Sequence, residues 1–149
     1  MSESRTSELN ISKIYEGYVL DHIRAGMSMK IYNYLRLGEL DCAIAMIMNT
    51  HSSKMGRKDM IKIECPVGTI DLNILGYIDH NITVNIIKNG AIQEKPALTL
   101  PKTITNVIRC KNPRCITSIE QGLDHVFVLS DAKKELYRCR YCEERYRGK

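Results

Sequence analysis

Three absences narrow the functions open to this chain. The longest unbroken apolar run, residues 42–48, is far shorter than the roughly 20 residues of a membrane-spanning helix. The first ten residues, MSESRTSELN, are polar and lack the apolar stretch of a secretory signal. Neither G-x-x-x-x-G-K-[ST] nor G-x-G-x-x-G occurs, so side chains rather than a glycine-rich loop would have to hold any nucleotide. We therefore expect a cytoplasmic protein that has no membrane partner.

The net charge of +5 over 149 residues is distributed unevenly. Residues 132–149 carry seven basic and three acidic side chains, and so supply four of the five positive charges. A basic tail can bind nucleic acid. It can also offset the charge of a thiolate metal site or face an acidic protein partner. Charge alone leaves these three interpretations open.

The first hundred residues alternate between strand and helix patterns. Apolar residues recur every three or four positions at Met27, Ile31 and Leu35, and again from Ile70 to Ile78, which predicts two amphipathic helices. Asn89-Gly90 is a strong signal for a two-residue hairpin turn. Strands are predicted at residues 14–23, 42–48, 60–65, 82–87 and 91–95, with a loop at 51–59. This order predicts an α+β domain, a ferredoxin-like antiparallel sheet with two helices on one face.

After Pro101 the helical periodicity stops, and short strands are predicted at residues 104–109, 126–129 and 135–139. About 48 residues are too few to bury an adequate core unaided, so this small all-β region needs an additional cross-link such as a bound metal or disulfides. We expect two domains, residues 1–99 and 100–149.

Four cysteines of the second region form two close pairs, C-x4-C and C-x2-C. They are Cys110, Cys115, Cys139 and Cys142. Two such turns can present four thiolates to one tetrahedral ion, which predicts one zinc per chain. Four protein ligands leave no open position, so this zinc would be structural. The alternatives are two disulfides or unrelated free thiols, and a cytoplasmic setting disfavours the disulfides. The other cysteines, Cys42 and Cys65, lie in apolar strands and are interpreted as small buried hydrophobic residues.

Polar groups of the first region offer a possible binding groove. Lys62, Asn85 and Lys95 lie on the non-core faces of three predicted strands. If these strands are sheet neighbours, the three side chains and Asp21 could line a groove for a ribose and a polyphosphate. Adjacent strand residues point to opposite faces, so Asp21 and His22 are not expected to form a relay with each other. The cations of the KMGRK loop, residues 54–58, could hold phosphate or could simply be solvated.

Four segments together carry a family resemblance. They are GYVLDHI at 17–23, MGRKDMIKIE at 55–64, TVN at 83–85, and C-x4-C…C-x2-C-E from Cys110 to Glu143. In this order, over residues 11–146, the chain resembles the regulatory chain of aspartate carbamoyltransferase. The resemblance implies a non-catalytic subunit of pyrimidine biosynthesis. Its first domain would bind nucleoside triphosphates such as CTP, UTP and ATP and pair with a second copy, and its zinc domain would dock on the catalytic chain.

The resemblance also implies an effector site. Lys62 would contact base and ribose, Asn85 and Lys95 would reach ribose and phosphates, and His22 would face the phosphates. The full set carried over is Ile14, Val19, Asp21, His22, Lys62, Asn85, Ile87, Ile92 and Lys95. Contact with the catalytic chain is expected through the cysteine turns, at Asn112, Arg140, Tyr141 and Glu143. Gly90 departs from the best-known members, which carry a tyrosine against the base at this position.

Two other functions compete with this interpretation. A zinc-ribbon nucleic-acid-binding protein would explain the basic tail, but only Tyr141 lies between the second pair of cysteines, and the first half has no basic-aromatic stripe. An enzyme could use Asp21, His22 and Lys62, but no nucleophile and base occur together in a recognisable context. The resemblance favours the regulatory subunit, with no nucleic-acid partner.

Overall fold

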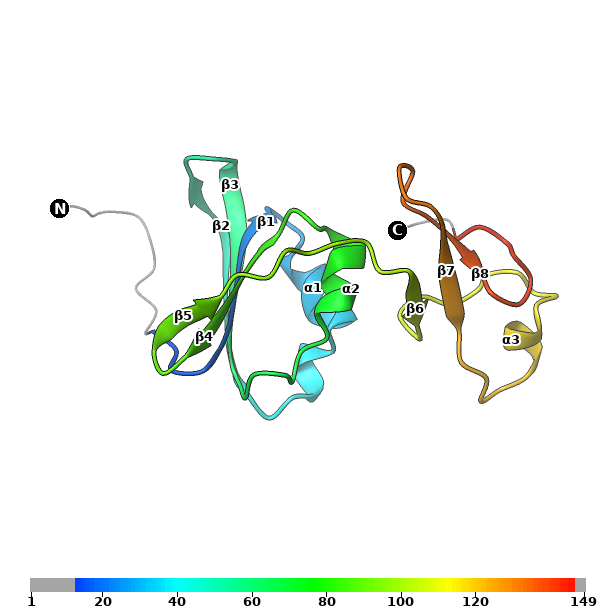
Figure 1. Ribbon diagram of the computed structural model, residues 1–149, viewed down its shortest axis with the longest axis horizontal. Helices are drawn as coiled ribbons and strands as arrows, with labels where there is room; N and C mark the ends of the chain where they lie inside the picture. Colours follow the sequence, from blue (N-terminus) through cyan, green and yellow to red (C-terminus); the bar gives the residue numbers. More distant parts are fainter. Residues whose placement is uncertain (1–12, 147–149) are drawn as a thin grey trace.

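The computed structural model describes residues 13–146, which form two antiparallel sheets (Figure 1). The five-stranded sheet has the order β2-β3-β1-β4-β5, with β1 Gly17–Arg24, β2 Ala43–Ser52, β3 Gly56–Glu64, β4 Thr83–Lys88 and β5 Ala91–Glu94. The second sheet has the order β6-β7-β8, with β6 Thr103–Thr105, β7 Val126–Asp131 and β8 Leu136–Cys139. The helices are α1 Ser28–Tyr34, the 3-10 turn η1 Leu37–Glu39, α2 Leu72–Ile78 and α3 Ile116–Ile119.

Helices α1 and α2 lie together on one face of the first sheet (Figure 1). Alternate residues of the strands are buried beneath these helices, among them Leu20, Ile61 and Val84. Ile31 of α1 and Leu75 of α2 are buried against them from the helix side. The alternation predicted for β3 and β4 is therefore confirmed, and so is the α+β class with a small second sheet. The opposite face of the five-stranded sheet, which no helix within residues 13–146 covers, is called the open face below.

The predicted loop at residues 51–59 is wrong. Strand β2 continues to Ser52 and β3 begins at Gly56, so only residues 53–55 form the turn. The end of this hairpin has few apolar residues because it projects beyond the helices, and a hydrophobic pattern therefore could not reveal it. Two of the KMGRK cations, Arg57 and Lys58, consequently lie in a strand rather than in a phosphate-binding loop. The first strand is also shorter than predicted, since β1 begins at Gly17.

Strand β6 is half the length predicted for residues 104–109. Asn106 has a left-handed backbone (φ 60°) that ends the strand. Its amide accepts a bond from the His125 N–H at 2.9 Å and donates one to Asp124 at 3.0 Å. The single helical turn α3 follows Cys115 and was not predicted, because four residues are too few to show a helical period.

A β-bulge in β1 overturns the expected placement of Asp21 and His22. Leu20 pairs with Ile61 and Ile23 pairs with Asp59, so β1 has one extra residue relative to β3. His22 has φ 58°, and both Leu20 and Ile23 are fully buried. Asp21 and His22 therefore both lie between two core positions, and the expectation that they point to opposite faces is wrong.

The two sheets meet through the segment that joins them. This segment passes α2, where a Cβ on Gly76 would overlap the carbonyl oxygen of Thr99. The rings of Tyr77 in α2 and Tyr137 in β8 pack edge to face, with centroids 5.1 Å apart. The Tyr137 hydroxyl donates to the Pro101 carbonyl at 2.6 Å. Because these contacts include buried aromatic rings, the hydrophobic core runs continuously from one sheet to the other.

Candidate metal centre and ligand pocket

The four cysteines of the second domain converge on one point. The Sγ atoms of Cys110 and Cys142 are 3.5 Å apart, and those of Cys115 and Cys139 are 3.7 Å apart. All four sulfur atoms lie within 4.8 Å of one another. A tetrahedral site with metal–sulfur bonds of about 2.3 Å has sulfur–sulfur edges of about 3.8 Å. The donor set and its dimensions therefore fit a single metal ion.

The pKa values of the clustered thiols are shifted in different directions by their surroundings. Burial alone would raise the pKa of Cys115, but bonds from the Thr117 hydroxyl and N–H, with those from neighbouring thiols, outweigh it and bring the pKa to about 7. The hydroxyl oxygen of Thr117 lies 3.1 Å from the sulfur of Cys115. Burial raises the pKa of Cys110 to about 12. A bound cation would lower both values, because metals bind the thiolate.

The outer surface of the cysteine turns is mostly exposed. Arg140, Tyr141 and Glu143 are exposed, whereas Asn112 is half-buried. The Asn112 side-chain oxygen accepts the Arg114 N–H at 3.0 Å, so this residue shapes the first turn. Among the residues expected to contact the catalytic chain, three are therefore accessible and the fourth is engaged within its own turn.

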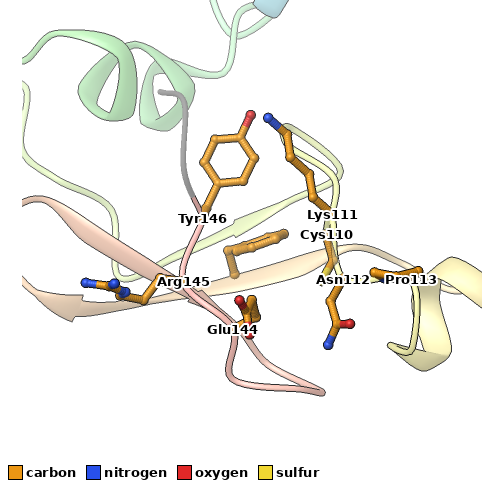
Figure 2. Close-up of a pocket in the computed structure, with 8 residues that line it drawn as sticks. Cys110, Lys111, Asn112, Pro113, Glu144, Arg145 and Tyr146 are labelled. Atoms are coloured by element: carbon orange, nitrogen blue, oxygen red, sulfur yellow. The ribbon is translucent and has the colours of Figure 1, made fainter.

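A pocket of about 210 Å³ lies beside the first cysteine turn (Figure 2). The rings of Phe127 and Tyr146 meet edge to face, with centroids 5.6 Å apart. The ammonium group of Lys111 lies 5.3 Å from the centre of the Tyr146 ring. Figure 2 shows Lys111 and Tyr146 reaching toward each other from separate segments, with Asn112 directed away from them. This contact links the segment that follows β8 to the first cysteine turn.

Residues expected to bind nucleotide form a row across the open face. Val19 of β1 pairs with Lys62 of β3 on one side and with Asn85 of β4 on the other. Ile86 pairs with Glu94, and extending that register by one residue puts Lys95 opposite Asn85. The strands that carry these residues are thus sheet neighbours. The side-chain oxygen of Asn85 is buried and has no hydrogen-bond partner among residues 13–146.

Beside this row the open face is hollowed into a pocket of about 390 Å³ that is lined in part by Lys62 and Val19 of the row itself. Five of the nine residues expected to bind nucleotide line it, namely Ile14, Val19, Lys62, Ile87 and Ile92. The hairpin turn beside it has positive φ at both Asn89 and Gly90, as predicted for Asn-Gly. No atom lies within 4 Å of a Cβ placed on Gly90, so glycine leaves the mouth of the pocket open.

Asp21, His22, Asn85 and Lys95 do not line this pocket. Asp21 forms an ion pair with Lys58 at 2.8 Å, and its carboxylate also accepts the His22 N–H at 2.6 Å. Burial opposes ionisation of Asp21, but Lys58 and His22 hold its pKa below the usual value. His22 Nδ1 lies 3.0 Å from the Thr83 hydroxyl. Lys58 and Thr83 were not predicted as the partners of Asp21 and His22, although both occur within the segments that carry the resemblance.

No helix among the described residues is long and apolar enough to cross a membrane.

A sheet whose open face carries a pocket of small-ligand size, joined to a domain that gathers four cysteines, defines a two-domain chain whose second domain has the donor set of a metal-binding domain. Residues 9–99 match the family model described as the aspartate carbamoyltransferase regulatory chain, allosteric domain. Residues 102–149 match the model for the metal-binding domain of the same chain. The chain therefore belongs to the family of aspartate carbamoyltransferase regulatory chains.

Named relatives agree with this family over most of their length. The chain is 54% identical to the aspartate carbamoyltransferase regulatory chain of Clostridium botulinum over 140 residues, which is 94% of this chain and 95% of the relative. It is 52% identical to that of Clostridium tetani over 139 residues, 93% of this chain and 96% of the relative. With that of Bifidobacterium longum it shares 40% identity over 136 residues, 91% and 97% of the two chains. These relatives are regulatory rather than catalytic chains, and their names imply a catalytic-chain partner.

Proposed function

We propose that this chain binds nucleoside triphosphates on the open face of its first sheet and passes their effect to the catalytic chains of a cytoplasmic aspartate carbamoyltransferase. Such a chain would regulate pyrimidine biosynthesis without catalysing a reaction. The observation that carries the proposal is the row of Lys62, Val19, Asn85 and Lys95, which runs beside an open pocket. We assign the nucleotide-binding role to residues 1–99 and the metal and docking roles to residues 100–149.

The row suits a nucleotide because its parts differ in chemistry. The pocket near Ile14, Ile87 and Ile92 is lined by apolar side chains and has the size of a small-ligand site. Its apolar walls fit a base. The side-chain amide of Asn85, in the middle of the row, can bond a ribose hydroxyl. Lys95 then supplies positive charge for a polyphosphate, and the ring of His22 offers a hydrogen-bonding nitrogen beside it.

Titration calorimetry of the chain with CTP and ATP tests this site. We expect binding that weakens about tenfold or more in both variants, because Lys62→Ala loses a contact with base and ribose and Lys95→Ala loses a cation that reaches the phosphates. Lys133→Ala is the matched control, since it removes the same charge from an exposed turn of the other domain. Equal affinity in all three variants would place the nucleotide elsewhere.

We further propose that the metal is one structural zinc per chain. Four thiolates in a closed tetrahedral set are typical of structural zinc. Metal analysis of the purified chain should return about one zinc per chain, and another metal or none would refute the assignment. Zinc would fix the two cysteine turns, and the exposed Arg140, Tyr141 and Glu143, with Asn112, would then contact the catalytic chain.

Self-association as a dimer is proposed for the free edge of β2. This strand ends the first sheet and pairs only with β3 among the described strands. Unpaired edges of this length favour pairing with another chain. A groove of about 470 Å³, formed in part by Leu40, Ile44 and Met46, adjoins the edge. Sedimentation equilibrium should give a dimer, and Ala45→Pro, which disrupts the edge, should shift it toward monomer.

A further inference from the structure

Two cysteines outside the metal centre lie opposite each other at the edge of the first sheet. Ala43 of β2 pairs with Glu64 of β3, and extending this register by one residue places Cys42 opposite Cys65. Residues directly opposite in an antiparallel pair have Cα atoms about 4.5 or 5.5 Å apart. A disulfide needs a Cα separation of about 4.4–6.8 Å. The backbone therefore meets the geometric requirement for a bond between them.

Both side chains also lie on the same face of the sheet. Cys65 follows the buried positions Ile61 and Ile63 at intervals of two, and Cys42 precedes Ile44 and Met46 in the same way. Cys42 and Cys65 belong to one packed cluster. The Cys42 thiol is close enough to influence the titration of Cys65, whose pKa is raised to about 11 by burial and, to a smaller extent, by Cys42.

The two thiols differ in access from solvent. Cys65 is only 5% exposed, whereas Cys42 is partly exposed and lines the groove beside β2. An oxidant can therefore reach Cys42 first, and the sheltered Cys65 is placed to react next. In an antiparallel sheet this arrangement resembles an attacking thiol beside a resolving one.

We propose that Cys42 and Cys65 are a redox modification site, which a low-molecular-weight disulfide converts to an intrachain disulfide. The Cys42 thiolate attacks one sulfur of the oxidant RSSR, forming a Cys42–SR mixed disulfide and releasing RS⁻. The Cys65 thiolate then attacks the Cys42 sulfur, forms the intrachain S–S bond and releases a second RS⁻. The two thiol protons end on these two leaving groups, so the oxidant is reduced to two RSH while the protein loses two hydrogens.

This site is separate from the metal centre and from the proposed nucleotide site. The four clustered cysteines belong to the second domain, and both Cys42 and Cys65 are free thiols at the β2–β3 end of the first sheet. The new bond would fasten the start of β2 to the end of β3. Because β2 is the edge strand of that sheet, oxidation would stiffen the edge on which we place self-association.

The test uses the full chain purified with its metal, treated with oxidised glutathione and then alkylated without reductant. Trypsin cleaves after Arg36, Lys54, Lys62 and Lys88, so Cys42 and Cys65 fall in separate peptides, 37–54 and 63–88. We expect mass spectrometry to find these two peptides joined, with loss of both alkylatable thiols of the first domain. Adding dithiothreitol should separate the peptides again.

Cys42→Ser and Cys65→Ala serve as matched variants, and neither should give the joined peptides. Since Cys42 is partly exposed, its serine variant should fold even if the buried alanine variant does not. Three results would overturn the proposal. They are glutathione retained on Cys42 without closure, a bond between the Cys42 residues of two chains on a non-reducing gel, and unmodified thiols at both positions. A failed nucleotide titration would leave the proposal intact, because the two sites share no residue.

Discussion

The two domains reach stability by different routes. The first buries a large set of side chains beneath its helices, among which Leu20, Ile31, Ile61 and Leu75 are fully buried. The second has few large buried side chains, chiefly Phe127 and Tyr137, and two of its other buried positions are Cys115 and Cys139. A regular apolar pattern therefore suffices for the first domain. The second depends on what its cysteines hold, because small domains bury too little apolar surface unaided.

The largest effect is expected from removing the metal. Chelation, or the change Cys142→Ser, should unfold the second domain, since the free energy of metal binding to such a small domain is largely folding free energy. The first domain should keep its structure and its nucleotide binding. Far-ultraviolet circular dichroism and amide exchange, resolved by domain, would measure this difference. If both domains melt together, the comparison fails, because the first domain would then depend on the metal as well.

The buried carboxylate of Asp59 joins three segments of the first domain by hydrogen bonds. Asp59 is fully buried and accepts backbone N–H groups from Gly26 and Ser28, at 3.0 and 3.2 Å, and from Asn49 at 2.7 Å. It thus ties β3 to the start of α1 and to the bulge in β2. Asp59→Asn should cost about 3 kcal/mol at neutral pH, since one amide oxygen cannot replace two carboxylate oxygens.

The pH dependence of this loss has a defined sign. Burial opposes ionisation, but the three N–H bonds hold the pKa of Asp59 below its usual value of 3.8. Its contribution is therefore complete above pH 3.8 and is lost as the pH falls further toward the folded-state pKa. Urea unfolding of the two proteins should differ most at neutral pH and converge in acid. A difference that grows below pH 3.8 would contradict this account.

A smaller effect is expected at the joint between the domains. Alanine is normally favoured over glycine in a helix by about 0.5–1 kcal/mol. Gly76→Ala should instead destabilise the chain by about 1–3 kcal/mol, since the new methyl group would overlap the Thr99 carbonyl. Asn73→Ala, at an exposed position of the same helix, is the control and should change little.

Thermal unfolding of these two variants would measure how much the contact between α2 and the linking segment contributes to stability. Amide exchange should also increase in residues 97–100 of Gly76→Ala, because the segment can no longer lie against α2. A Gly76→Ala chain as stable as the Asn73→Ala chain would show that the segment yields without cost.

Much of this architecture could be predicted from the sequence, for reasons that differ between elements. Strands β3 and β4 alternate regularly, so period-2 patterns gave both their existence and the side on which Lys62 and Asn85 lie. The bulges at His22 and Asn49 were not predicted, because they depend on register against a neighbouring strand. The same is true of the left-handed Asn106, whose side-chain partners lie 18 and 19 residues away.

The candidate sites likewise divide into features that local patterns predict and features that depend on strand pairing. The spacing of the cysteines was sufficient to predict their convergence, because each pair is local in sequence and only one long-range approach is needed. Lys58 as the partner of Asp21 could not be predicted in this way. It appeared to lie in a loop, and its strand is recognisable only once β1 and β3 are paired. Cross-strand partners thus mark the limit of local patterns.

The central claim is that a nucleotide on the first domain alters a catalytic chain that contacts the second. It is tested most directly by aspartate saturation of the complex reconstituted from this chain and the catalytic chain, with and without CTP and ATP. We predict that a bound nucleotide shifts the half-saturating aspartate concentration by about fivefold or more, the usual scale of coupling between sites. The shift should vanish when zinc is removed, while the released catalytic chain stays active. Coincident curves for every nucleotide that binds would contradict the claim and leave the chain a scaffold.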